Sequence, residues 1–360
     1  MTAAVQRSED IRVALFGFGL GGESFHAPLI AATPGLRLAT IVTTHPERRE
    51  RARRAFPDAQ LADSPEQVFE RGGEHDLAVI STPNRTHVSL ALAALNAGLG
   101  VVVDKPFAAN ADDARRVVAA AKRARLFLSA YHIRRWDSEL LTVKRLLNEG
   151  ALGEVLRFES RLDRWRPLVR EVWRERDAPE EAGGLLYDLG SHLIDQALHL
   201  FGKADTVYAE LDRRRAGVLV DDDIFIALTH ASGVRSHLGA SLVSAQKRAR
   251  MCVLGSRAAY VKSRGDLQEE QLRAGLRPDR ADWGLEPEEY WGWLGVEGDV
   301  RRVRSEAGAY QSFYAGVVAS LRTGAPPPVD PEEAVAGLEI IAAAQRSAAE
   351  RRVITLSEPT

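Results

Sequence analysis

The chain of 360 residues contains one cysteine, Cys252, and only six lysines against 42 arginines. A single cysteine excludes an intramolecular disulfide and favours a reducing compartment. The sequence has no run of about 18 apolar residues and no apolar run among its first ten residues, so neither a membrane helix nor a signal peptide is predicted. We therefore expect a cytoplasmic protein.

The charge balance also excludes classes of partner. A formal net charge of −2 gives no reason to expect a nucleic acid or an anionic membrane as partner. The hydrophobic content of 45% is that of an ordinary globular protein. Because 360 residues exceed what one core usually supports, we expect two domains, at residues 1–131 and 132–360.

A glycine motif follows the first apolar segment. Residues 11–16 are predicted to form a strand that leads into G-x-G-x-x-G and then into a helix over 23–32. In this spacing the first glycine makes a tight turn, the second lets a backbone approach a pyrophosphate, and the third lets the helix pack on the strand. The predicted cofactor-binding residues of this loop are Gly17, Phe18, Gly19, Leu20 and Gly22. The alternative is a glycine-rich hairpin without a ligand.

The alternation of predicted strands and helices decides between a cofactor-binding loop and a hairpin without a ligand. Further strands are predicted at 36–42, 76–81, 100–104 and 126–130, and helices at 46–55, 64–71, 84–97 and 110–124. This alternation predicts a doubly wound parallel sheet, a Rossmann domain, which a hairpin would not explain.

The end of the second strand indicates which nicotinamide cofactor binds. An acid there would bind the ribose 2′-hydroxyl of NAD, whereas a 2′-phosphate needs hydroxyls and cations. This sequence has Thr43, Thr44 and Arg48, and its nearest carboxylate, Glu47, follows a proline. We therefore favour NADP over NAD. The neighbouring arginines fit a solvated helix face equally well.

Two more segments are predicted at the same sheet edge. Thr82, Pro83 and Asn84 follow the 76–81 strand and are expected to line the cofactor, with His87 nearby on a helix. Asp104 ends the predicted 100–104 strand and Lys105 follows it, and both are also predicted to bind the cofactor. In a chain so poor in lysine, this ammonium indicates proton chemistry, because lysine is a compact charge whose pKa shifts readily. A surface lysine in a turn is the alternative reading.

An aspartate and a histidine follow a pair of glycines at 183–184. Asp188 and His192 are four residues apart, which on a helix places the carboxylate beside the imidazole, as a general base requires. A structural pair in a core is the alternative, and Asp195 is a competing partner for His192. Polar and aromatic residues after the sixth strand are predicted to contact the substrate, although each fits packing equally well: Tyr131, His132, Arg135 and Trp136.

The remaining sequence predicts an α+β domain. A helix (138–149) and a strand (154–162) precede strands near 205–212, 223–230, 233–243, 250–255 and 258–261, which indicate a large, mainly antiparallel sheet. We expect its open face to self-associate, giving a homodimer or homotetramer. Residues 264–304 are interpreted as a long loop region, residues 310–321 and 332–350 as helices, and 353–356 as a last strand. The 332–350 helix is expected to pack back on the first domain.

Three of these segments together resemble the Gfo/Idh/MocA oxidoreductases: the glycine motif, Asp104-Lys105-Pro106, and residues 183–195. Residues 25–28, 131–137 and 187–196 resemble the NADP-dependent scyllo-inositol 2-dehydrogenase branch of that family. The resemblance implies that Lys105, Asp188 and His192 form the catalytic group. Asp104 stands where glutamate is commoner in the family.

The resemblance implies hydride transfer between NADP(H) and a secondary hydroxyl or ketone of a cyclic polyol or sugar. His192 is expected to take the hydroxyl proton, Asp188 to orient and stabilise His192, and Lys105 to stabilise the alkoxide. No ligand cluster of recognisable spacing predicts a metal. The alternatives are a reductase of another sugar, an aldehyde or an imine, and a non-catalytic NADP-binding redox sensor.

Overall fold

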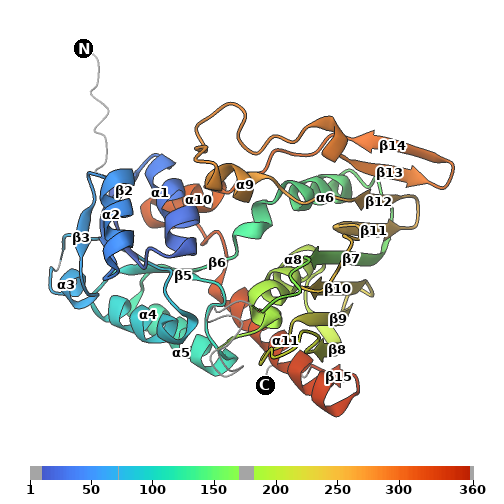
Figure 1. Cartoon of the computed structure of the whole chain (residues 1–360), viewed down its shortest axis with the longest axis horizontal. Helices are drawn as coiled ribbons and strands as arrows, with labels where there is room; N and C mark the ends of the chain where they lie inside the picture. The colour runs from blue at the N-terminus through green and yellow to red at the C-terminus, as the bar shows by residue number, and fades with distance from the viewer. Residues whose placement is uncertain (1–9, 72, 170–181, 357–360) are drawn as a thin grey trace.

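The structure is a computed structural model that describes residues 10–71, 73–169 and 182–356. It contains two β-sheets on opposite sides of the view in Figure 1. The strands of the first sheet come from residues 11–131, and those of the second from residues 155–355.

The first sheet has six parallel strands in the order β3-β2-β1-β4-β5-β6. They are β1 (Ile11–Phe16), β2 (Leu36–Val42), β3 (Gln60–Ala62), β4 (Leu77–Ile80), β5 (Gly100–Asp104) and β6 (Leu128–Tyr131). The order reverses between β1 and β4, and ligands of such sheets bind at the carboxyl ends of the strands there. The Rossmann fold is confirmed, although the short β3 was not predicted.

Helices connect these strands. They are α1 (Ala27–Ala32), α2 (Pro46–Ala55), α3 (Glu66–Phe69), α4 (His87–Asn96) and α5 (Ala111–Ala124). The helix expected from residue 23 begins as a π-helical turn over Gly22–His26 and continues as α1. Because helices lie along the sheet, β5 is a continuous apolar run in which Val101, Val102 and Val103 are almost completely buried.

The second sheet has nine strands in the order β14-β13-β12-β11-β7-β10-β9-β8-β15. They are β7 (Val155–Asp163), β8 (Ala204–Asp212), β9 (Asp223–His230), β10 (Arg235–Ser241), β11 (Met251–Gly255), β12 (Ala259–Lys262), β13 (Gly292–Val296), β14 (Asp299–Val303) and β15 (Ile354–Thr355). Only the β7–β10 pair is parallel among these described strands, so the sheet is mainly antiparallel, as predicted.

One face of the second sheet is more deeply buried than the other. On β9, Ile224, Ile226 and Leu228 are buried, whereas Phe225 and Ala227 between them stay partly exposed. The longer helices of this half are α6 (Ser138–Asn148), α8 (Ser191–Phe201), α10 (Gln311–Thr323) and α11 (Pro331–Glu350). Helix α11 contacts both α5 of the first half and β8 of the second.

The interpretation of residues 264–304 as a loop was wrong. This segment contains α9 (Gln268–Arg273) and the β13–β14 hairpin. The hairpin escaped notice because glycines and charges interrupt its apolar pattern, yet Gly292 is required: a Cβ there would lie 2.4 Å from the Tyr260 ring. Among the described helices, none combines the length and the hydropathy needed to cross a membrane.

Candidate active site

Lys105 lies directly after β5 and reaches the second half of the chain. Its Nζ atom donates to the backbone oxygen of Asp188 at 2.6 Å and to the Asp188 carboxylate at 2.9 Å. The Lys105 side chain is 14% exposed and that of Asp188 is 29% exposed. The structure thus joins two predicted catalytic residues that are 83 positions apart.

Asp104 fixes the backbone beside Lys105. Its carboxylate accepts a hydrogen bond from the Lys105 amide at 2.8 Å and from the Ser81 hydroxyl at 2.9 Å. The His26 ring is 3.4 Å from the same carboxylate. Burial alone would raise the pKa of Asp104, but the nearby His26 ring, followed by the charges of His87 and Lys105, lowers it below its usual range. Asp104 therefore acts as a half-buried anion that positions the lysine.

His26 belongs to an aromatic cluster that the strand and helix pattern did not indicate. Its Nδ1 atom lies 2.6 Å from the hydroxyl of Tyr314, and its ring centroid lies 3.9 Å from that of Tyr131. His26 and Tyr314 are 288 positions apart, so local spacing carries no signal for the contact. The only signal was the segment 25–28 within the family resemblance.

His192 lies in the first turn of α8 and is buried. Burial, and next the charges of Lys105 and Arg134, lower its pKa well below the usual value. The imidazole is therefore neutral at neutral pH. Its Nδ1 atom is buried and has no hydrogen-bond partner among the described residues.

The expected contact between Asp188 and His192 is not among the described hydrogen bonds, and the Asp188 carboxylate contacts Lys105 instead. Asp188 lies in a π-helical turn, Leu186–Gly190, whereas His192 lies in the α-helix that follows. The α-helical spacing rule therefore does not describe this pair. π-Helical turns of this kind are frequent at functional sites.

Arg135 is committed to an ion pair and is not free to bind a substrate. Its buried guanidinium donates to Asp195 at 2.6 and 3.0 Å and to Glu333 at 2.6 Å. Asp195, the competing partner considered for His192, is thus engaged by Arg135. His132 is also buried; its Nδ1 atom is 3.9 Å from Asp195, and burial is the main cause that lowers its pKa.

The two aromatic residues predicted at the substrate pack into the interior. Tyr131 is buried against His26 and Phe313, and its hydroxyl has no hydrogen-bond partner among the described residues. Trp136 packs edge-on against Phe313, with ring centroids 5.8 Å apart. Packing, the alternative considered for each residue, accounts for these contacts.

The glycine loop has the geometry of a pyrophosphate cradle. Gly17 has a φ of +96°, which favours glycine, and a Cβ on Gly22 would lie 2.1 Å from the Gly17 carbonyl oxygen. A Cβ on Gly19 would meet only Arg48 within 4 Å, at 3.8 Å, so this backbone is open to a ligand. The residues present therefore fit a dinucleotide.

The side chains around the loop differ in their surroundings. Phe18 is completely buried and packs edge-on against Phe56, so only its backbone faces the loop, whereas Leu20 is 48% exposed. Thr43 is buried, and its carbonyl oxygen accepts from Arg49 at 3.0 Å. The two other residues predicted to recognise a 2′-phosphate, Thr44 and Arg48, are exposed.

His87 ties the β4 end to the loop that carries Lys105. Its two ring nitrogens each lie 2.9 Å from a carbonyl oxygen, those of Thr82 and Pro106. Asn84 is buried and donates to the Ala182 carbonyl at 3.1 Å. Pro83 precedes the short 3₁₀ turn Asn84–Thr86. His87 and Asn84 thus hold the backbone of the site in place.

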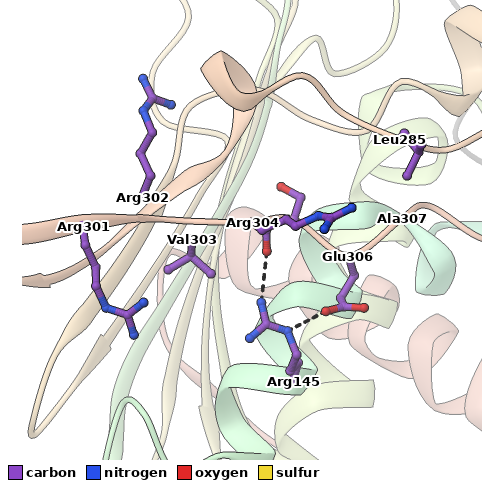
Figure 2. Close-up of a pocket in the computed structure, with 9 residues that line it drawn as sticks. Arg145, Leu285, Arg301, Arg302, Val303, Arg304, Glu306 and Ala307 are labelled. Atoms are coloured by element: carbon purple, nitrogen blue, oxygen red, sulfur yellow. Dashed lines mark hydrogen bonds and ion pairs between the residues drawn. The ribbon is translucent and has the colours of Figure 1, made fainter. Parts of the chain in front are cut away.

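A separate cavity of about 570 Å³ lies beside β14 and α6, and Figure 2 shows it. The Arg145 guanidinium donates there to Glu306 at 2.5 Å, and Arg301 and Arg302 lie on opposite sides of the strand. None of the predicted site residues lines this cavity. Within the described ranges, no group of three or more His, Cys, Asp or Glu side chains could hold a metal ion.

Family models match nearly all of the described chain. Residues 11–132 match the oxidoreductase family NAD-binding Rossmann fold, GFO_IDH_MocA. Residues 144–356 match the C-terminal alpha/beta domain of the same oxidoreductase family.

Full-length relatives agree with these matches. The chain is 41% identical to the uncharacterized oxidoreductase YdgJ of Escherichia coli, over 97% of this chain and 100% of that protein. It is 34% identical to the scyllo-inositol 2-dehydrogenase (NADP(+)) IolW of Bacillus subtilis, over 98% of this chain and 97% of that protein.

A solved structure shows the same fold. An oxidoreductase of Bacillus subtilis, yvaA, superposes with a TM-score of 0.92 at 33% identity, over 98% of this chain and 100% of that one. The chain therefore belongs to the Gfo/Idh/MocA oxidoreductase family and is an NAD(P)-dependent dehydrogenase of that family.

Proposed function

We propose that this enzyme is an NADP-dependent dehydrogenase that oxidises a secondary hydroxyl of a cyclic polyol or sugar of the scyllo-inositol type. The observation that carries the proposal is the contact of Lys105 with Asp188, four residues before His192, whose Nδ1 atom has no hydrogen-bond partner among the described residues, at a sheet edge that also carries the open glycine loop. These groups provide a cation, its counter-ion and a neutral base at the carboxyl edge of the first sheet.

His192 accepts the hydroxyl proton in this proposal. Its ring is kept neutral by burial and by nearby cations, so a nitrogen lone pair is available at neutral pH. A buried nitrogen without a partner costs about 1–3 kcal/mol, and a substrate hydroxyl that donates to it removes that cost. Because the Asp188 carboxylate contacts Lys105 rather than the His192 ring, we assign Asp188 the role of holding the lysine.

Lys105 stabilises the negative charge that develops on the substrate oxygen. Its ammonium is held in place by two oxygens of Asp188, and a positive charge fixed there would stabilise a developing alkoxide. When bound, the nicotinamide supplies the hydride acceptor of this oxidation. Asp104, His26 and His87 position the lysine backbone but do not contact the reacting atoms.

NADP is proposed over NAD because Arg48 is exposed beside Gly19, at the edge where a 2′-phosphate would lie. Thr44 is exposed near it. The relative IolW has NADP(+) in its printed name, which supports the same cofactor.

We also propose that the chain divides into two domains between residues 131 and 132. We further propose that the protein forms a homodimer or homotetramer across the open face of the second sheet. Phe225 on β9 and Trp293 on β13 are partly exposed, and assembly would bury such side chains. Light scattering at micromolar protein tests the assembly, and a monomer mass would refute it.

The test of function is NADPH formation by the purified enzyme with NADP or NAD and a panel of inositol isomers and aldoses. We expect NADPH to form with scyllo-inositol and NADP. Activity restricted to ketones, aldehydes or imines would instead support a reductase. NADP binding without turnover of any substrate would support a redox sensor.

A further inference from the structure

The cavity beside β14 and α6 has no part in the proposed function. Its volume of about 570 Å³ falls within the range of about 300–1,000 Å³ that is usual for small-molecule sites. Four of the nine described residues that line it are arginines, and one, Glu306, is an acid. A cleft lined mainly by one sign of charge attracts ligands of the opposite sign. The lining therefore favours an anion.

The wall of the cavity is fixed by contacts with α6. Arg145 on this helix donates to the backbone oxygen of Arg304 at 3.0 Å and to the Glu306 carboxylate at 2.5 Å (Figure 2). The N–H of Glu306 donates to the hydroxyl of Thr142, also on α6, at 2.8 Å. The wall is thus already ordered when a ligand arrives, which lowers the entropic cost of binding.

The arginines of the lining differ in how far acids compensate their charge. Arg145 is compensated, because it pairs with Glu306 at 2.5 Å and with Glu149 at 3.1 Å. Arg301 and Arg304 are exposed and form no ion pair within the described ranges. These two guanidinium groups therefore keep a free positive charge at the cavity.

The fourth arginine is held away from them. Figure 2 shows Arg301 on the same side of β14 as Arg145, and Arg302 on the opposite side. The Arg302 guanidinium donates to the Glu288 carbonyl at 2.7 Å and lies over the Trp293 ring, 4.6 Å from its centroid. A ligand in the cavity would therefore be bound chiefly by Arg301 and Arg304.

A phosphoryl group matches two guanidinium groups better than a carboxylate does. At neutral pH it carries about −1.5 to −2 charges and three acceptor oxygens, whereas a carboxylate carries one charge and two oxygens. The cavity is much larger than a phosphoryl group, and Leu285 and Ala307 add apolar surface to its lining. We propose that it binds a small organic phosphate, with the phosphoryl group on Arg301 and Arg304 and the carbon skeleton against Leu285. None of the residues of the proposed function lines the cavity, so binding there is independent of turnover.

Calorimetry on the full-length enzyme loaded with NADP tests this site, because the cofactor then fills the glycine loop. The probes are phenyl phosphate, inorganic phosphate and benzoate. We expect one phenyl phosphate to bind per chain, at least about 10-fold more tightly than benzoate, which has the same ring but a single charge. Inorganic phosphate should bind more weakly than phenyl phosphate, because it has no apolar group to place against the lining.

Arg301→Gln and Arg304→Gln should each raise the Kd for phenyl phosphate about 10- to 100-fold, the usual loss for a hydrogen bond to a charged group. Both side chains are exposed, so the variants should fold, and an unchanged Tm checks this. Arg123→Gln is the matched control, because Arg123 is an exposed arginine on α5 of the other half. It should bind phenyl phosphate as the wild type does, and all three variants should keep the wild-type Kd for NADP.

Several outcomes would overturn the assignment. If neither phosphate binds to the wild-type enzyme, the cavity is not a phosphate site, and if the two arginine variants bind phenyl phosphate normally, the ligand lies elsewhere. Benzoate binding as tight as that of phenyl phosphate would show that one negative charge is enough. Tighter binding of inorganic phosphate would remove the apolar contact, and a raised Kd for NADP in either variant would show that these arginines bind the cofactor.

Discussion

Lys105→Met tests the proposed chemistry most directly. Methionine keeps an unbranched side chain, one atom shorter, but removes the ammonium that would stabilise the developing alkoxide. Loss of one such donor costs about 3–4 kcal/mol in the transition state, or about 10²–10³ in kcat. Because Lys105 also lowers the pKa of His192, the pKa of this histidine should rise in the variant, and the acid limb of the rate profile should move to higher pH.

The same substitution should leave the protein folded. The lysine side chain is 14% exposed, and the variant loses its two hydrogen bonds to Asp188. The Asp188 side chain is 29% exposed, so water can hydrate its carboxylate. We expect a loss of about 1–2 kcal/mol in the free energy of unfolding.

The assay is NADPH absorbance at saturating NADP and substrate, together with NADP binding measured by fluorescence. Lys122→Met is the matched control: this lysine on α5 is 67% exposed and pairs with Glu332 at 2.5 Å, a kind of contact worth at most about 1 kcal/mol. A Lys105→Met enzyme that keeps kcat within about threefold of wild type would refute the reasoning, because a lost donor of this kind costs far more.

Three further predictions concern the cofactor and the base. Gly22→Ala places a methyl group 2.1 Å from the Gly17 carbonyl, so we expect NADP binding to weaken at least about 100-fold by fluorescence titration. Gly337→Ala is the control, because the methyl group added there meets nothing within 4 Å. If the Gly22→Ala and Gly337→Ala variants bound NADP equally well, this account of the glycine loop would be contradicted. Arg48→Glu should raise the Kd for NADP about 10- to 100-fold and leave that for NAD nearly unchanged, and equal losses for both would exclude a 2′-phosphate contact. Because burial and then Lys105 lower the pKa of His192, its ring stays neutral while a solvated histidine would become protonated, so kcat should stay constant from about pH 8 to about pH 6 and fall only below that. A half-maximal rate near the usual histidine pKa would contradict this assignment.

Much of the fold could be predicted because its signals are local. The β-branched run before Asp104 is long enough to identify a strand buried on both faces. The β13–β14 hairpin could not be found in this way, because Gly292 and Gly295 interrupt its pattern for contacts made elsewhere. A Cβ on Gly292 would enter the Tyr260 ring, and one on Gly295 would lie 2.1 Å from the Asp299 carbonyl oxygen.

The site was less predictable because its partners are chosen by tertiary contacts. The spacing of Asp188 and His192 suggested a local pair, but the aspartate contacts a lysine 83 positions away. Arg134 and Arg135 are adjacent, and the sequence could not show that Arg135 is the one that pairs with Asp195 and Glu333.

Helix α11 affects how the enzyme can open. It contacts α5 on one side and β8 on the other, with exposed ion pairs from Lys122 to Glu332 and from Arg115 to Glu339. A wide hinge motion would have to separate one of these contacts along its length, whereas sliding along the helix axis would exchange only the exposed ion pairs. Substrate exchange should therefore proceed by a small shear between the two halves, and amides of α5 and α11 should exchange with solvent as one unit.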